Sequence, residues 1–454
     1  MDNFGFLTLV PTLVVISTAV VFHRPIAALL AGVVVGVVMV SPDNIMGNLA
    51  DINLAVMQDE TIGWVIMVCG LMGSLIYLLI RTGGASAFAM TMAAKANTRN
   101  KSLLVTWLLG MIIFIDDYLN AIAIGSAMKK VTDQFKVSRA MLSYVVDSTA
   151  APTCVIVPIS TWAVFFAGVL EATDVAETGK GMLMYISGIP YMAYPFVAIV
   201  LVPFVATGKF PLIGPMRKAE ARAKEGILAL EPVEYINNAD SVLSEEVKSR
   251  TNLWVFLGPL FCLIGFSVYF DIDLLKGIFA TLALSIPVFV WMKLLKMNEA
   301  LDCVMEGFKI MIPPLAIVVV AFMFKTVNDQ LGLPQFIIES VQPYMSVVLL
   351  PVITFWTMAL ISFATGSSWG VFAIAIPVIM PLAEAVGVPT PLAIGALLSA
   401  SSFGSHACFY GDATVLSAQS SGLSVMEHAL TQLPYALVAA AIASVIFIGF
   451  GLSL

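Results

Sequence analysis

The stretch FIDDYLNA, residues 114–121, sets two carboxylates, Asp116 and Asp117, side by side among apolar neighbours. Asn120 follows within one helical turn. Carboxylate and amide oxygens bind small cations, and a carboxylate removed from water also favours a proton. Adjacent helix positions point about 100° apart, which leaves one aspartate to cap a helix while the other binds an ion.

A second polar stretch, Asp147-Ser148-Thr149, lies in a segment that Pro152 and Pro158 are expected to interrupt. If residues 101–128 form a hairpin, free backbone carbonyls at its tip join the carboxylates in holding a dehydrated Na⁺. A cation and a proton then compete for one group, which is an antiport mechanism. The alternative is that the aspartates only cap helices. We expect ion or proton binding by Asp116, Asp117, Asn120, Asp147, Ser148 and Thr149, with Na⁺ held by Asp116, Asp117 and Asp147.

The second half of the chain offers mostly neutral polar groups, in TGSSWG (365–370) and SASSFGSHACFYGDAT (399–414). Glycines there allow the backbone to unwind, and the hydroxyls suit an organic substrate. The alternative is helix packing through small and hydroxyl residues. His406 and Asp412 are expected to titrate or to pair, while His23 and His428 are interpreted as surface residues at helix ends. The candidate substrate-binding residues are Thr365, Gly366, Ser367, Ser368, Ser401, Ser402, Ser405, His406 and Asp412.

Composition defines the setting of these residues. Of the 454 residues, 60% are hydrophobic and 11% charged, and the mean hydropathy is +0.98. Such a chain is typical of a polytopic membrane protein, and its long apolar runs predict helices rather than barrel strands. We predict about ten crossings, at 4–22, 25–41, 62–80, 140–170, 182–206, 252–270, 275–295, 309–326, 391–420 and 430–452.

Two further apolar stretches, 101–128 and 345–386, are interrupted by polar tips and are predicted to be re-entrant hairpins. For the second stretch, two tilted crossings remain an alternative. A hairpin at 101–128 puts all but three of the 22 Lys and Arg residues on one side of the membrane, the exceptions being Lys180, Lys276 and Lys325. Basic loops mark the cytoplasmic side, so the sidedness favours the hairpin and places both chain ends outside.

The order of elements on either side of the charged segment 207–251 is the same, which predicts an internal repeat. Five crossings per half invert the second repeat relative to the first, with broken helices meeting near the midplane, as in many transporters. The predicted organisation is a first membrane repeat at 1–206, a solvated cytoplasmic linker at 207–251 and a second repeat at 252–454. Segments 81–100 and 297–308 are expected to lie at the interface.

FIDDYLN (114–120), DSTAAP (147–152) and GSHACFYGD (404–412) occur in this order. In these motifs, and over nearly its whole length, the chain resembles the NhaC-type Na⁺/H⁺ antiporter family of the ion-transporter superfamily. The resemblance implies two inverted repeats with hairpins and transport driven by Na⁺ or H⁺ gradients. That family also includes a malate/lactate exchanger and suspected amino-acid carriers, so the resemblance indicates the mechanism better than the cargo.

We therefore expect a secondary transporter, not an enzyme, that exchanges Na⁺ for H⁺ without any cofactor beyond these coupling ions. One alternative is Na⁺- or H⁺-coupled transport of an amino acid or small carboxylate between the two polar tips. Another is an intramembrane aspartyl protease, although the repeat and the doubled aspartate have no role in that chemistry. No P-loop or potassium-filter motif favours a pump or a channel.

The expected partners are the lipid bilayer, a small cation and, in the alternative, a small organic substrate. No nucleic acid is expected, because the net charge is −7. A homodimer is one option for the oligomeric state. The predicted location is a bacterial-type inner membrane, with the 207–251 loop in the cytoplasm.

Overall fold

A computed structural model describes residues 4–22, 25–94, 96–230, 232, 251–270, 273–365, 368–409 and 411–454. The described residues form helices joined by turns, and their only β pairing is an isolated bridge between Pro232 and Leu423. The prediction of an all-α protein is confirmed. The five cysteines all lie in this described part, and no disulfide joins them.

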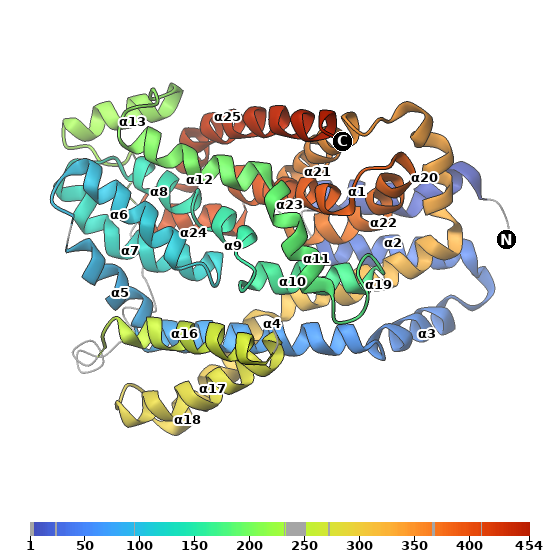
Figure 1. Ribbon diagram of the computed structural model, residues 1–454, viewed down its shortest axis with the longest axis horizontal. Helices are drawn as coiled ribbons and strands as arrows, with labels where there is room; N and C mark the ends of the chain where they lie inside the picture. The colour runs from blue at the N-terminus through green and yellow to red at the C-terminus, as the bar shows by residue number, and fades with distance from the viewer. Residues whose placement is uncertain are drawn as a thin grey trace.

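The elements of the first half follow the predicted spans, with the expected break before Pro158 (Figure 1). The span predicted at 182–206 is instead two segments, Gly181–Tyr191 and Ala193–Ala206, bent by 53°. The elements of this half are η1 Gly5–Leu9, α1 Val10–Phe22, α2 Pro25–Val40, η2 Pro42–Asn44, α3 Ile45–Met57, α4 Glu60–Arg81, α5 Gly84–Ala93, α6 Arg99–Ile112, α7 Asp117–Gln134, α8 Arg139–Asp147, α9 Ala151–Ile156, α10 Thr161–Ala172, α11 Gly181–Gly188, η3 Ile189–Tyr191 and α12 Ala193–Ala206.

After α13, Gly214–Lys224, the second half repeats this order. Its elements are α16 Trp254–Tyr269, α17 Leu274–Trp291, α18 Met297–Ile310, α19 Ile312–Leu331, α20 Leu333–Val341, η4 Gln342–Tyr344, α21 Leu349–Thr365, α22 Ser368–Val386, α23 Thr390–Ala407, α24 Asp412–Ser421 and α25 Val425–Leu452.

The helices are long and apolar enough for a multi-pass membrane protein. Within the described residues, five helices could each cross a membrane, and nine segments could if every bent helix pair counts as one span. Three shorter apolar helices accompany them, at Gly5–Thr18, Trp254–Tyr269 and Leu349–Ala364. These segments together account for the spans predicted from the sequence.

The two halves share distinctive local geometry. In each half the helix after the hairpin is broken and bent by 40°, at residues 157–160 in the first half and 408–411 in the second. A left-handed glycine precedes each short helix that follows a long span: Gly83 (φ 69°) before α5 and Gly332 (φ 76°) before α20. Glycine adopts this conformation without the steric cost that a side chain adds. The equivalent glycines are thus Gly83 and Gly332.

Both stretches predicted to be hairpins form helix pairs, and α22 of the second pair is long and apolar enough to cross a membrane by itself, as the two-crossing alternative requires. α6 and α7 pack against each other and against α8, and α21 and α22 do the same against α23. The first pair lies at the end of the molecule that also holds α13, whereas α19, α20 and α22 lie toward the other end (Figure 1). The hairpins therefore approach the middle from opposite ends, as inverted repeats require.

The halves also interlock around this middle. α24 packs against α7 and α8, α25 against α8 and α12, and α23 against α9 and α12. Outside this core, α4 crosses α18 at backbone contact distance. Ser74 Oγ donates a hydrogen bond to the Val304 carbonyl at 2.7 Å. Such close crossings need residues without a side chain, here Gly73 and Gly307.

Two segments differ from the sequence-based expectation. Residues 45–57, to which no element was assigned, form α3, which is bent by 115° from the α2 axis and capped by Asn44. In the 207–251 segment, predicted to be a solvated linker, α13 buries Met216, Ala219 and Glu220. α13 has one apolar face, and this face packs against α8 and α25. Residues 233–250 lie outside the described part.

Two glycines of α4 give a matched stability test. A Cβ at Gly73 would lie 2.5 Å from the Gly307 carbonyl oxygen, whereas a Cβ at Gly63 would meet nothing within 4 Å. Both substitutions to alanine gain the same helix propensity, but overpacking costs about 1–3 kcal/mol. We expect Gly73→Ala to lower the thermal unfolding midpoint of the detergent-purified protein and Gly63→Ala to leave it equal or higher. Equal midpoints for the two variants would contradict the close crossing.

Candidate functional site

Asp116 is the cap of the first hairpin's second arm. Its Oδ1 accepts from the Tyr118 and Leu119 amides, both at 3.0 Å, which satisfies donors that every helix start leaves open. Its Oδ2 accepts from the Thr161 hydroxyl at 3.1 Å, and the Thr161 amide donates to the Ile115 carbonyl at 3.0 Å. The hairpin tip is thereby fastened to the start of α10.

Asn120 holds the hairpin closed. Its Nδ2 lies 2.8 Å from the Gly110 carbonyl oxygen, 2.9 Å from that of Ile113 and 3.2 Å from that of Thr149. The first two carbonyls end α6, and the third belongs to the turn after α8. One amide group therefore ties both arms of the hairpin to the first broken helix.

Asp117 lies beside Asp116 but has none of its partners. The residue is 2% exposed, and its buried Oδ1 makes no hydrogen bond with any described residue. The Trp162 indole N–H lies close to this carboxyl group, outside hydrogen-bonding geometry. Unmatched buried polar atoms cost about 1–3 kcal/mol each, more when charged, so each of them requires an explanation. Four such atoms belong to α7, α9 and α10: Asp117 Oδ1, Asn120 Oδ1, Thr153 Oγ1 and Trp162 Nε1.

Asp412 joins this region from the second half. The Tyr118 hydroxyl donates to Asp412 Oδ2 at 2.9 Å. Asp412 is the first residue of α24, where the helix dipole stabilises a carboxylate. α10 and α24, the second pieces of the two broken helices, thus both begin beside the first hairpin's tip.

Asp147 has a different set of partners. It is fully buried at the end of α8 and accepts from Ser417 Oγ at 3.3 Å, His428 Nε2 at 3.0 Å and Gln432 Nε2 at 2.6 Å. The sequence predicted one Na⁺ site shared with Asp116 and Asp117. In the described residues, no group of three or more His, Cys, Asp and Glu side chains could hold a metal ion.

The interpretation of His428 as a surface residue is wrong. Its side chain is 0% exposed and forms an ion pair or hydrogen bond with Asp147, depending on its protonation. His428 does lie in the first turn of α25, but α24 and α8 pack over that turn. His23 lies outside the described residues.

His406 connects this group to further residues of both halves. Its Nε2 lies 2.9 Å from Ser148 Oγ, and its Nδ1 lies 2.6 Å from the Tyr194 hydroxyl oxygen. Gln432 Nε2 also donates to the His406 carbonyl, so one amide bridges the two histidine neighbourhoods. His406 and Asp412, which were expected to titrate or pair, therefore bond to different partners. Thr149 bonds back to its own helix through Oγ1.

The second hairpin's tip is partly described. Gly366 and Ser367 lie outside the described residues, and of Thr365 only the backbone is described. Ser401 Oγ donates to the Ser368 carbonyl at 3.3 Å, and the Ser405 carbonyl accepts from Thr414 at 3.1 Å. Ser402 Oγ is buried without a hydrogen bond to the described part of the chain. The hydroxyls of Ser401 and Thr414 therefore bind neighbouring backbone, whereas that of Ser402 has no such partner among the described residues.

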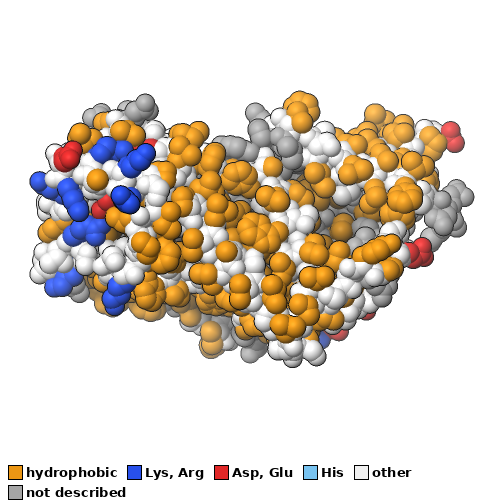
Figure 2. All heavy atoms as spheres, turned by 90° about the horizontal axis from the view of Figure 1, so that it is seen from above, with side chains coloured by type: hydrophobic (Ala, Val, Ile, Leu, Met, Phe, Trp, Pro, Cys, Tyr) orange, Lys and Arg blue, Asp and Glu red, His pale blue; other side chains and the backbone are white. Residues whose placement is uncertain are grey.

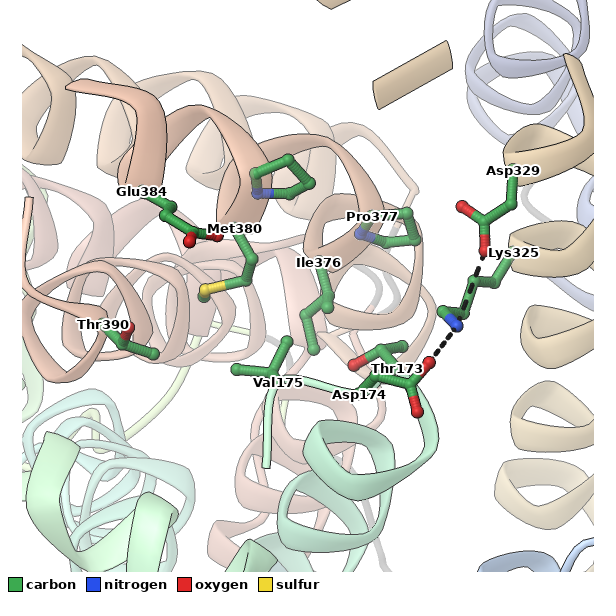
Figure 3. A pocket seen from close by; sticks show the side chains of 11 residues that line it. Thr173, Asp174, Val175, Lys325, Asp329, Ile376, Pro377, Met380, Glu384 and Thr390 are labelled. Carbon is green, nitrogen blue, oxygen red and sulfur yellow. Dashed lines mark hydrogen bonds and ion pairs between the residues drawn. The ribbon is translucent and has the colours of Figure 1, made fainter. Parts of the chain in front are cut away.

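Aromatic side chains join the second hairpin to the first site. Trp369, one residue into α22, packs on Trp162 with ring centroids 5.3 Å apart and on Phe165 at 4.5 Å. One turn further along α22, Phe372 packs on Phe166 at 4.2 Å. Beyond these two aromatic layers lies a pocket of about 340 Å³ between the α10–α11 loop, α19 and α22 (Figure 3).

Charge is distributed unevenly over the molecule. Lys and Arg side chains gather at the left end in Figure 2, the end at which α6, α8 and α13 lie in Figure 1. Two ion pairs lie at this end, Arg99–Glu220 and Arg222–Glu427, each with an N–O distance of 2.6 Å. The glutamate side chain of each pair is buried. They join α13 to α6 of the first half and to α25 of the second.

Sequence reasoning missed several residues of these networks. In α25, His428 and Gln432 lie four positions apart, which puts both on one face of the helix. That spacing was an available signal. Trp162, Thr161 and Tyr194 carried no comparable signal, because their roles depend on which helix start faces the hairpin tip.

Inverted halves, broken helices that meet in the middle and buried carboxylates at a hairpin tip define this membrane protein as a secondary transporter. Residues 164–452, more than half of the chain, match the family described as the Na⁺/H⁺ antiporter family. The chain belongs to that family.

Two curated proteins are similar in sequence. An uncharacterised protein of Haemophilus influenzae is 26% identical over 471 residues, which cover 98% of this chain and 90% of that protein. The malate-2H⁺/Na⁺-lactate antiporter of Bacillus subtilis is 34% identical over 94 residues, which cover 20% of each chain.

Two solved structures share the fold, each at 13% sequence identity. The YdaH transporter of Alcanivorax borkumensis has a TM-score of 0.61, with 90% of each chain covered. MtrF of Neisseria gonorrhoeae, described with a class of antimetabolite efflux pumps, has a TM-score of 0.51, with 89% of this chain and 83% of that chain covered. Both likenesses concern the fold alone.

The closing role of Asn120 can be tested by its removal. Asn120→Ala removes two N–H donors that serve three buried carbonyls, which we expect to cost about 3 kcal/mol and to lower the thermal unfolding midpoint in detergent. Asn53→Ala is the control, because Asn53 is exposed in α3. If the two variants unfold at the same temperature, the bridging amide does not hold the hairpin.

Proposed function

We propose that the protein exchanges Na⁺ for H⁺ across a bacterial inner membrane, and that Asp117 binds the cation. The observation that carries this proposal is the buried, unmatched Oδ1 of Asp117, with the unmatched Oδ1 of Asn120 one turn away. Two unpaired oxygen acceptors in a dry site suit a dehydrated monovalent cation. Asp116 is the structural member of the pair, because three donors already occupy it.

The proton site in this proposal is the Asp147–His428 pair. Ser417 Oγ, His428 Nε2 and Gln432 Nε2 surround the Asp147 carboxyl group at 3.3, 3.0 and 2.6 Å. His428 Nδ1 is buried and makes no hydrogen bond to the described residues. In this proposal it is the nitrogen that takes up the transported proton.

The backbone around Ser148 couples the two sites. Asn120, beside the proposed cation, bonds to the Thr149 carbonyl, and Asp147 ends the same helix two residues earlier. A cation that pulls Asn120 therefore acts on the turn that positions Asp147. The clustering of basic side chains at the α13 end supports a cytoplasmic position for that end (Figure 2).

A second candidate is Na⁺- or H⁺-coupled transport of a small carboxylate. The unmatched hydroxyl of Ser402 favours it, as does the 94-residue similarity to the Bacillus subtilis malate-2H⁺/Na⁺-lactate antiporter. In this case an organic group lies between the two hairpin tips, and Na⁺ still binds at Asp117.

The exchange itself is tested in liposomes that hold purified protein and a pH-sensitive dye. We expect external Na⁺ alone to move protons, and Asp117→Asn to reduce that flux at least about tenfold, since its site loses the charge that binds the cation. Asp51→Asn, at an exposed position of α3, should match the wild type. Proton flux only after addition of a carboxylate would favour the second candidate, and a fully active Asp117→Asn variant would remove Asp117 from the site.

The proton site is tested separately with His428→Gln. Glutamine keeps a donor for Asp147 but cannot bind a second proton, so Na⁺-driven proton flux should fall at least about tenfold. Exchange of ²²Na⁺ for Na⁺, which needs no proton, should stay within about twofold of the wild type. Proton flux that persists in this folded variant would sink the assignment to His428.

A further inference from the structure

The pocket of about 340 Å³ lies on the other side of the aromatic layers from Asp117. Its lining comes from three parts of the chain: the loop after α10, α19, and α22 with the start of α23 (Figure 3). Lys325 Nζ is 2.7 Å from Asp174 Oδ2 and 3.5 Å from Asp329 Oδ2. Glu384 adds a third carboxylate to this wall, so acids outnumber the single base.

Two helices run from this pocket to the candidate cation site. α10 begins with Thr161 and Trp162 beside Asp116 and Asp117, and Thr173 just after its end lines the pocket. α22 begins at Ser368 in the second tip, and its Ile376 lines the pocket. At about 1.5 Å per residue, the pocket lies roughly 12–18 Å along these helices from their starts at Ser368 and Thr161.

Aromatic side chains of the same two helices fill the space between. Phe165, Phe166 and Phe372 are each 0% exposed, and they pack with Trp369 in the two layers described above. Such layers exclude hydrated ions while they are in contact, and a small separation of α10 from α22 opens them. The Lys325–Asp174 ion pair joins α19 to the α10–α11 loop in the lining of the pocket. We call the contact between the aromatic side chains of α10 and α22 the aromatic seam.

The pocket lies toward the end opposite α13. The chain runs from Arg139, whose amide donates to the Leu228 carbonyl after α13, through α8, α9 and α10 to Asp174. The three basic residues predicted to be outside also lie around this loop: Lys180 pairs with Glu177, Lys325 pairs with Asp174, and Lys276 lines a second pocket together with Gly179.

We infer that the pocket lined by Thr173, Asp174, Lys325, Ile376, Glu384 and Thr390 is the outer vestibule of the transport pathway, through which an inorganic monovalent cation reaches Asp117. The inference rests on the proposed function and adds the route and the gate to it. The cavity, the two shared helices and the aromatic seam carry it. The excess of carboxylates raises the local cation concentration.

The second pocket supplies a matched control. It measures about 500 Å³ and lies against the same loop and the last turn of α10, at Glu171. Its other walls come from α4, α11 and α17, and no residue of α22 lines it. Thr390 lines the proposed vestibule and Thr178 lines this second pocket. Thr390→Cys and Thr178→Cys are therefore equivalent changes in two neighbouring cavities.

The test measures ²²Na⁺ exchange in proteoliposomes before and after treatment with a bulky, charged methanethiosulfonate, with complete modification verified by mass spectrometry. We expect modification to lower the ²²Na⁺ exchange rate of Thr390→Cys at least about tenfold, because an attached group obstructs a narrow pathway. Modified Thr178→Cys and treated wild type, with its five native cysteines, should change by less than about twofold.

Fully modified Thr390→Cys that retains at least half of its exchange would overturn the inference, as would equal losses in both variants. If Thr390→Cys is inactive before treatment, Thr173→Cys takes its place under the same criteria. The wild-type measurement separates this outcome from failure of the proposed function. If wild type moves no Na⁺ for H⁺ but does carry a carboxylate, the exchange proposal fails. The vestibule is then tested by measuring carboxylate flux before and after modification of the same cysteine variants.

Discussion

The cost of removing carboxylates from water governs this structure. A charged aspartate inside a membrane protein requires partners, because an unpaired one costs several kcal/mol. Asp116 obtains three donors and Asp147 obtains three, and each set includes residues from a different helix. Oδ1 of Asp117 obtains none from the described residues. The two neighbouring carboxyl groups of one motif therefore have different surroundings, and only Asp116 is held by the donors of helix starts.

These donors explain the broken helices. A continuous helix uses its amides internally and has none to offer, whereas the starts of α7, α10 and α24 expose amides and hydroxyls in the middle of the molecule. The inverted repeat brings the starts of α10 and α24 to the same hairpin tip from the two halves. Irregular backbone in the middle of the molecule disrupts helix packing. It also frees amides and hydroxyls from helical hydrogen bonds, and these groups bind the carboxylates.

The sequence predicted the parts of this arrangement that depend on local chemistry. Hydropathy gave the spans, and proline, glycine and aspartate marked the breaks near Asp147, Pro158 and Thr365, because these residues oppose a continuous helix wherever they occur. The prediction that His428 is a surface residue was wrong, because it considered only that the residue lies near the end of a helix. It did not consider that His428 shares a helix face with Gln432. The neighbours of Trp162 and Tyr194 could not be derived, since they depend on how two distant segments pack. α3 was missed because its 13 residues are too short and too polar to resemble a span.

The helix α13 has a mechanical consequence. Glu220 binds Arg99 in the first half, and Arg222, two residues later, binds Glu427 in the second. Both pairs have a buried acidic partner, so separating either one leaves a desolvated charge behind. Rocking of one half against the other must therefore either carry α13 along with both halves or turn about it. The helix that lies between the two halves in sequence thus restricts how far they can separate at this end of the molecule.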